Sequence, residues 1–237
     1  GARNCTPYGR DMARMFSYRL AAAGVFVISG MALGIDGWGH QGALEAGGET
    51  YAVLGSGVMR CYPSCHQNLY ESIVRHGGVI SEFPVYARAK PVFFPMRNRI
   101  ISGLSDGILV VEAREKSGSL ITADAALEQG KDVFVIPGRI GDELSVGCNR
   151  LIRMGAVPVL TPDDILDYYG VKTSDGSRNV NETEQKILAF LGGKTMHMDE
   201  ISAGLSLPMT QLLKCMIVLQ KKGYVIEVGR NFFMKKI

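Results

Sequence analysis

The stretch from Gly107 to Gly130 constrains the fold of this chain more than any other part of it. It begins with a continuous apolar run at 108–111, which is typical of a strand buried on both faces of a sheet. A polar loop and a helical pattern at 120–129 follow, and a second apolar run comes at 133–136. This order predicts a strand–loop–helix–strand unit of a parallel sheet.

The loop of this unit lies at the carboxyl end of its strand and the amino end of its helix. Open α/β sheets bind ligands there, because free backbone N–H groups and the helix dipole attract anions. Gly118 permits close approach of a ligand, Ser117 and Ser119 add hydroxyl groups, and Lys116 adds a positive charge. We interpret the loop either as a phosphate cradle or as a helix start capped by Ser119, and the two are compatible.

Apolar strands and helical patterns alternate in the same way along residues 1–170. Further strands are expected at 25–28, 50–54, 79–83 and 157–160, and helices at 7–23, 36–46, 66–75, 97–104, 148–154 and 162–169. The alternation indicates an α/β fold with a doubly wound parallel sheet. No strand precedes Gly1, so we expect the first strand of the sheet to lie upstream of this sequence.

The last part of the chain follows a different pattern. Residues 171–181 lack apolar periodicity and are expected to be a linker. Within 182–237 we expect helices at 182–191, 198–204 and 208–222 and strands at 224–228 and 232–234, which together predict a small winged-helix domain. The side chains expected to face inward from its third helix are Leu212, Leu213, Met216 and Leu219.

The third helix of this winged helix offers few groups for reading DNA. Its candidates are Thr210, Gln211 and Lys214. Protein contacts and DNA contacts therefore both stay open as its role.

Composition and charge place the chain among ordinary intracellular proteins. Its five cysteines are scattered and odd in number, so a disulfide framework is not expected and a reducing cytoplasm is the default. It has no apolar run of membrane-spanning length, and we expect no signal peptide.

The net charge of +3 arises entirely in residues 180–237, which hold 8 basic and 5 acidic residues, while residues 1–179 hold 18 of each.

A local cluster of charge is more informative than the net charge. No acidic residue lies between Glu82 and Asp106, although this segment contains Arg88, Lys90, Arg97 and Arg99. Such a segment is either a solvated basic surface or an electrostatic footprint for a polyanion.

Aromatic and basic residues also alternate within this segment, at 93–99. Basic grooves with stacking platforms hold single-stranded nucleic acids, so the mixture favours that role. The alternative is that both phenylalanines lie in the core and the arginines pair with carboxylates such as Glu82 or Glu112.

Two further clusters were weighed as catalytic or metal sites. Asp36 and His40 share a helix face and form either an acid–base pair or, more commonly, a buried contact that holds a loop. Cys61, Cys65 and His66 are too few for a closed zinc site, and no second cluster lies nearby. Because no nucleophile motif is present either, we expect no catalytic residue and no metal.

An ordered set of motifs in this chain is similar to that of the DNA-processing protein A (DprA/Smf) family. The resemblance covers residues 1 to about 160, and the tail is similar to the winged helix common at the carboxyl end of that family. The motifs are Gly1-Ala2-Arg3, Tyr8-Gly9, Ser29-Gly30-Met31-Ala32-x-Gly34-Ile35-Asp36-x-x-Gly39-His40, Ala52-Val53-Leu54-Gly55-x-Gly57, Tyr62-Pro63, Ser81-Glu82-x-Pro84, Phe94-Pro95-x-Arg97-Asn98-Arg99 and Lys116-Ser117-Gly118-Ser119.

The resemblance implies an extended Rossmann-like core that forms a homodimer and binds single-stranded DNA. It further implies that the protein protects the strand and helps load RecA recombinase in natural transformation, as a protein that is not an enzyme and needs no cofactor. Carried over by position, the DNA-binding residues are Arg3, Ser29, Gly30, Arg97, Asn98, Arg99, Lys116, Ser117, Gly118 and Ser119. Arg97, Arg99 and Lys116 would neutralise phosphates, while backbone N–H groups and hydroxyls would hold them.

The sequence departs from the family pattern at two positions. Ala2 stands where Ser or Thr is frequent, which removes a hydroxyl beside Arg3, and Gly39 stands where Ala is common. A competing resemblance is to lysine-decarboxylase-like Rossmann proteins that hydrolyse nucleoside monophosphates. Thr122 occupies the position of their catalytic glutamate, which favours binding over hydrolysis. A nucleotide sensor with a winged-helix output is a third possibility.

Overall fold

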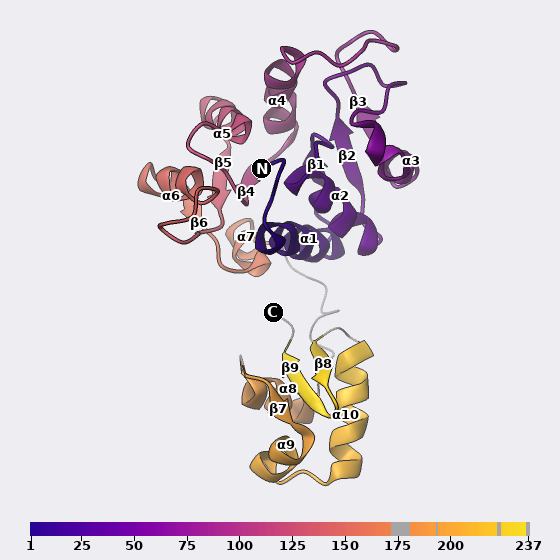
Figure 1. Cartoon of the computed structure of the whole chain (residues 1–237), viewed down its shortest axis with the longest axis vertical. Helices are drawn as coiled ribbons and strands as arrows, with labels where there is room; N and C mark the ends of the chain where they lie inside the picture. The colour runs from indigo at the N-terminus through magenta and orange to yellow at the C-terminus, as the bar shows by residue number, and fades with distance from the viewer. Residues whose placement is uncertain (172–180, 193, 222–223, 236–237) are drawn as a thin grey trace. The chain divides into compact units, whose positions relative to one another are not determined.

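The computed structural model describes residues 1–171, 181–192, 194–221 and 224–235. The chain forms two compact units, Gly1–Thr173 and Ser174–Ile237. Figure 1 shows the α/β character of the first unit and the small antiparallel sheet of the second. Most of the predicted linker lies outside the described residues.

The first unit contains two parallel sheets of three strands each. One has the order β1 (Val27–Ser29), β2 (Thr50–Val53), β3 (Gly77–Ile80), and the other has the order β4 (Gly107–Val110), β5 (Asp132–Val135), β6 (Val157–Pro158). The predicted α/β class with parallel strands is thus confirmed. No hydrogen-bonded pairing joins the two sheets among the residues that the structure describes.

Helices connect the strands of both sheets. They are α1 (Pro7–Ala22), α2 (Ile35–Glu45), α3 (Gln67–Arg75) with a preceding 3₁₀ turn η1 (Ser64–His66), α4 (Phe93–Leu104), α5 (Gly118–Glu128), α6 (Val146–Arg153) and α7 (Pro162–Tyr168).

The start of α1 follows from its sequence. The Thr6 hydroxyl accepts a hydrogen bond from the Gly9 N–H at 3.0 Å, and Pro7 takes the first helical position. Glu112, which follows β4, accepts the Thr6 hydroxyl proton at 2.5 Å and so ties this helix to the sheet.

Alternate residues of β5 divide between the two faces of the sheet. Val133 and Val135 pack with side chains of α5 and α6, whereas Phe134 packs with side chains of α1 and α7. Helices therefore cover both faces, as a doubly wound arrangement requires.

Several predicted boundaries were wrong by a few residues. Helix α4 begins at Phe93 rather than 97, because Pro95 lies in its first turn, where no intrahelical N–H is needed. Gly77 and Gly78 belong to β3 and do not end a helix. A Cβ on Gly77 would collide with the Thr50 carbonyl oxygen, so this glycine allows β2 and β3 to pair closely.

The second unit has the elements predicted for a winged helix, with one extra strand. It comprises α8 (Glu182–Leu191), β7 (Met196–His197), α9 (Met198–Leu205), α10 (Met209–Lys221), β8 (Val225–Gly229) and β9 (Phe232–Lys235). The strands pair antiparallel in the order β7, β9, β8. The two-residue strand β7 escaped prediction because it is too short to show a period-2 pattern.

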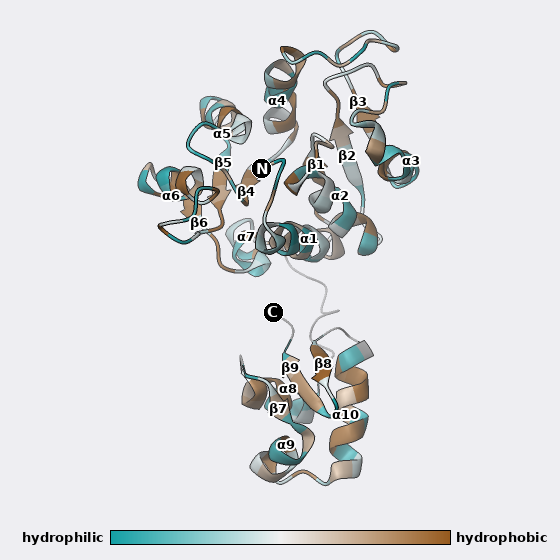
Figure 2. Cartoon of the chain, in the orientation of Figure 1, coloured by the Kyte–Doolittle hydropathy of each residue, from teal (hydrophilic) through white to brown (hydrophobic). Residues whose placement is uncertain are grey.

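Helix α10 has both a buried and an exposed apolar face. Leu212, Met216 and Leu219 are buried as predicted, whereas Leu213 is 50% exposed and Cys215 faces the core in its place. Figure 2 shows brown, hydrophobic residues along much of α10. No single helix in the described ranges is long and apolar enough to cross a membrane; α9 and α10 meet that criterion of length and composition only as a pair, bent by 115°.

Candidate nucleic-acid interface

A cleft of about 860 Å³ opens in the first unit between β1 and β4. Its rim includes the loops that follow these two strands. Eight of the ten residues predicted to bind DNA line it: Arg3, Ser29, Arg97, Asn98, Lys116, Ser117, Gly118 and Ser119. Gly30 and Arg99 are not among its lining residues.

The loop before α5 has the geometry of an anion-binding helix start. Ser117, and not Ser119, is the N-cap: its backbone is extended, and its hydroxyl oxygen accepts the Ser119 N–H at 3.4 Å. The two serine hydroxyls lie 2.7 Å apart, and a Cβ on Gly118 would meet no atom within 4 Å. The backbone at Gly118 is therefore open to a ligand at the positive end of the helix dipole.

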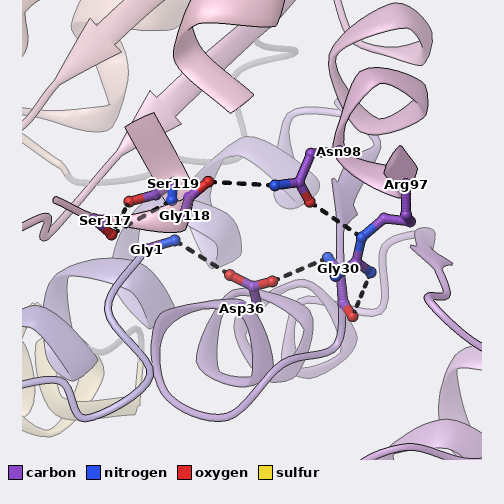
Figure 3. A network of polar contacts seen from close by, with 8 residues as sticks. All are labelled: Gly1, Gly30, Asp36, Arg97, Asn98, Ser117, Gly118 and Ser119. Atoms are coloured by element: carbon purple, nitrogen blue, oxygen red, sulfur yellow. Dashed lines mark hydrogen bonds and ion pairs between the residues drawn. The ribbon is translucent and has the colours of Figure 1, made fainter. Parts of the chain in front are cut away.

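Asn98 connects this loop to α4. Its amide Nδ2 donates to the Gly118 carbonyl oxygen at 3.3 Å, and its Oδ1 accepts from Arg97 Nε at 3.2 Å (Figure 3). The side chain thus ties the loop before α5 to α4.

Two cations are available at the cleft. Arg3 is exposed, and its guanidinium lies 5.3 Å from the centroid of the Phe94 ring. Lys116 is also exposed and makes no ion pair with any residue in the described part of the chain. Phe94 further contacts the Tyr62 ring, with centroids 5.5 Å apart, so Arg3 rests on an aromatic surface.

Arg97 has a structural role beside the DNA contact predicted for it. The residue is 4% exposed, and its Nη1 donates to the carbonyl oxygens of Gly30, at 2.8 Å, and Val53. A Cβ on Gly30 would lie 2.5 Å from this guanidinium, so any other residue there would displace it. The guanidinium holds the loop after β1 in place, and its contact with a DNA phosphate stays a prediction.

The backbone N–H of Gly30 is also already bonded. It donates to Asp36 Oδ2 at 3.2 Å, and the backbone nitrogen of Gly1 lies 3.3 Å from Asp36 Oδ1 (Figure 3). The Gly30 N–H is thus engaged within the protein, and the contact of Gly30 with DNA stays a prediction. Burial acts to raise the pKa of Asp36, whereas the neighbouring Arg97 guanidinium acts to lower it.

Arg99 does not line the cleft. Its guanidinium forms an ion pair with Glu82, which agrees with the alternative that the arginines of this segment pair with carboxylates. Residues 97 and 99 are two positions apart on α4, which places their side chains on nearly opposite sides of the helix.

Asp36 and His40 do not form an acid–base pair. His40 is fully buried and its Nδ1 lies 2.6 Å from the Thr50 hydroxyl, which donates its own proton to the Val27 carbonyl oxygen. The Nδ1 atom therefore carries the proton, and Nε2 has no hydrogen-bond partner within the described residues. This pair of contacts fastens α2 to β1 and β2.

Folding stability is expected to fall between pH 6.5 and 4 because of His40. Burial, opposed by Asp36 and assisted by Arg97 and His66, lowers the pKa of His40 from 6.5 to about 4. As the pH falls below 6.5, the unfolded chain binds a proton at His40 while the folded chain does not. The free energy of unfolding therefore decreases until the pH reaches about 4, where the folded chain binds the proton too. Between pH 7 and 4.5, the free energy of unfolding of the unmodified chain should decrease by about 2–3 kcal/mol more than that of His40→Asn.

Urea unfolding at a series of pH values measures this loss. His76→Asn, at an exposed histidine of the same unit, is the matched control and should keep the full pH dependence. An unchanged pH dependence in His40→Asn would contradict the assignment.

The described residues offer neither a metal cluster nor the hydrolase acid. No group of three His, Cys, Asp or Glu side chains in the described ranges could hold a metal ion. Thr122 lines the cleft, in the first turns of α5, at the position of the glutamate in the hydrolase pattern. A threonine hydroxyl does not replace a carboxylate as a general acid or base.

Residues 1–170 match the family described as DNA recombination-mediator protein A. The chain belongs to this family. Protein Smf of Escherichia coli K12 is 38% identical over an alignment of 245 positions, which covers 98% of this chain and 66% of that protein. DNA processing protein DprA of Bacillus subtilis 168 is 40% identical over 184 residues, 78% of this chain and 60% of that protein. The chain thus spans about two thirds or less of these family members.

Solved structures of the family superpose on the first unit. DNA processing protein A of Streptococcus pneumoniae superposes with a TM-score of 0.66 at 40% identity. The superposed part covers 70% of this chain and 59% of the Streptococcus pneumoniae chain. The Helicobacter pylori protein, whose structure concerns its single-stranded DNA binding mode, has a TM-score of 0.66 at 28% identity, over 71% of this chain and 77% of its own. A molybdenum cofactor binding protein of Rippkaea orientalis shares the fold alone. Its TM-score is 0.50 at 19% identity, over 70% of this chain and 89% of the Rippkaea orientalis chain.

Proposed function

We propose that this chain binds single-stranded DNA in the cleft between β1 and β4, without strong sequence preference. The observation that carries the proposal is the open start of α5 at Ser117–Ser119, which lies in one cleft with the exposed cations Arg3 and Lys116. Phosphate contacts from such groups carry no sequence information. The single-stranded DNA binding of the Helicobacter pylori relative supports the same ligand.

The proposal includes the wider role implied by the family. The chain would protect single strands and help load RecA recombinase on them in natural transformation, as a homodimer formed through its first unit and without catalysis of its own. Thr122 supports the absence of catalysis, because the general acid or base of the related hydrolases is missing from this cleft.

Salt-dependent DNA binding tests the site. We expect Lys116→Ala and Arg3→Ala each to weaken binding of a labelled oligo(dT) and to reduce the slope of log K against log salt by about 0.7, the value for one phosphate contact on a single strand. Fluorescence anisotropy over a salt series measures both quantities, with duplex of equal length as competitor.

Arg99→Ala is the matched control, because it removes an exposed arginine of the same unit that is paired with Glu82 and lies outside the cleft. Its slope should equal that of the unmodified chain. If Arg99→Ala lowers the slope and Lys116→Ala does not, the cleft is not the DNA site. If no single strand binds at low salt, the proposed function is wrong.

A further inference from the structure

Two loops of the first unit form a surface outside the cleft, which we call the double loop. They follow β2 and β3 and comprise residues 55–63 and 84–92. The Gly57 N–H donates to the Ala87 carbonyl oxygen at 2.9 Å, and the Met59 N–H donates to that of Val85 at 3.0 Å. Figure 1 shows both loops beyond the ends of β2 and β3, beside α4. Their backbone pairing makes one unit of the two loops.

Further contacts hold the shape of the double loop. The Ser81 hydroxyl donates to the Ser56 carbonyl oxygen at 2.6 Å. Phe83 and Phe93, which flank the second loop, stack with ring centroids 4.0 Å apart and so hold its two ends together. A Cβ on Gly57 would collide with the backbone of the second loop, so the two loops are in close contact. An ordered surface of this kind loses little conformational entropy when it binds a ligand.

The double loop exposes aromatic and apolar side chains. Tyr86 is 68% exposed and Tyr62 is 49% exposed. Met59 and Val85 are also at least half exposed. Exposed apolar groups that gather on a rigid surface mark an interaction site, and an exposed tyrosine ring can stack with a flat partner.

The charged side chains of the double loop are all basic. No acidic residue occurs in the sequence at 50–70 or at 83–105. Arg60 and Arg88 are exposed and make no ion pair with any residue that the structure describes. Both guanidinium groups are therefore available to an anionic ligand.

An aromatic pair joins the double loop to the cleft. The Tyr62 ring packs against Phe94 with centroids 5.5 Å apart, and Phe94 lines the cleft. The Arg3 guanidinium lies 5.3 Å from the centroid of the same Phe94 ring. The surface that begins at Arg3 in the cleft thus continues through Phe94 to Tyr62.

We propose that the double loop is a second binding surface for the single strand that occupies the cleft. Tyr62 and Tyr86 stack with bases, and Arg60 and Arg88 bind phosphates. Rigid aromatic rings beside unpaired cations are the combination that holds single strands, and stacking is sequence-tolerant because every base has a π-face. The inference rests on the proposed function and extends it to residues outside the cleft.

The length of the oligonucleotide separates the double loop from the cleft. We expect Tyr86→Ala to weaken binding of an oligo(dT) of about 20 nucleotides by about fivefold or more. Binding of an oligo(dT) of about 5 nucleotides should be unchanged, because so short a strand occupies the cleft alone. Fluorescence anisotropy at low salt measures both affinities on the full chain.

Two variants are the controls for this experiment. Tyr86→Phe keeps the ring and should bind both oligonucleotides as the unmodified chain does. Tyr18→Ala removes a tyrosine of α1 that is 48% exposed and does not line the cleft, and it should also leave both affinities unchanged.

The outcomes distinguish this proposal from the proposed function. If Tyr86→Ala binds the longer strand as tightly as the unmodified chain, or weakens both strands equally, the double loop is not a DNA surface, although the cleft still is. A loss in Tyr86→Phe as large as that in Tyr86→Ala would rule out stacking. If the unmodified chain binds neither strand, the proposed function fails and this proposal fails with it.

The salt dependence of the same binding tests the two arginines. Arg60→Ala and Arg88→Ala should each reduce the slope of log K against log salt by about 0.7 for the longer strand and leave that of the shorter strand unchanged. Tyr86→Ala should leave both slopes unchanged, since a stacked ring carries no charge. Unchanged slopes in both arginine variants would overturn the phosphate contacts.

Discussion

Replacing Arg97 by alanine is expected to lower the free energy of unfolding by about 3 kcal/mol or more. The substitution leaves the buried carbonyl oxygens of Gly30 and Val53 without their donor and removes a positive charge that stabilises Asp36. The loop after β1 then loses its anchor, so we expect DNA binding to fall with stability. Urea unfolding and oligonucleotide anisotropy on the same samples measure the two effects.

Arg99→Ala is again the control for this experiment. It removes the same side chain two positions away on α4, where 59% of the side chain is exposed, and surface ion pairs contribute at most about 1 kcal/mol. Arg97→Lys should recover part of the stability, because an ammonium group donates to fewer carbonyl oxygens in a fixed geometry. Equal losses for Arg97→Ala and Arg99→Ala would refute the anchoring role.

Gly34→Ala is expected to be as damaging, by about 3 kcal/mol, for a reason of backbone geometry. Gly34 has φ 76° and ψ −129° just before α2, a conformation that is essentially restricted to glycine. A Cβ there would also collide with the carbonyl oxygens of Ala2 and Arg3. The substitution should therefore displace Arg3 and weaken DNA binding as well as the fold.

Gly47→Ala separates the two causes. Gly47 has φ 71°, but a Cβ on it would meet no atom within 4 Å, so the expected cost is about 1 kcal/mol from left-handed backbone strain alone. Its DNA affinity should match that of the unmodified chain. A loss of affinity in Gly47→Ala as large as in Gly34→Ala would mean that general destabilisation, and not displacement of Arg3, is responsible.

Local signals predicted most helices and strands of this chain. Thr6 and Pro7 mark the start of α1, Gly130 has the positive φ of a helix stop, and the apolar runs coincide with β4 and β5. These features depend on neighbouring residues and can be predicted without knowledge of the fold. The boundary of α4 could not, because the sequence alone does not show whether Pro95 lies before a helix or within its first turn.

The sequence indicated which residues come together, but not what each of their side chains contacts. Eight predicted residues line one cleft, because the carboxyl ends of parallel strands meet at one edge. The pattern of arginines and aromatics did not show which arginine points inward. Once α4 is known to begin at Phe93, the angular separation of Arg97 and Arg99 assigns one to the interior and the other to the surface.

Asp36 was the least predictable feature of the site. Its carboxylate binds the Gly30 N–H six residues earlier, a contact that depends on the path of the loop and leaves no trace in composition or periodicity. The one local feature of the sequence that marks Asp36 is its place in the first turn of α2, where an acidic residue complements the helix dipole.

The position of Asp36 has a consequence for what the cleft can hold. Of the helices that follow β1 and β4, α2 and α5, the first has its own carboxylate in its first turn, near the place where many Rossmann proteins bind a phosphate of their cofactor. Of these two helix starts, that of α5 is left for a ligand anion. A mononucleotide would therefore bring one phosphate to this start, whereas a polymer brings neighbouring phosphates to the exposed cations Arg3 and Lys116 as well and gains affinity from each contact.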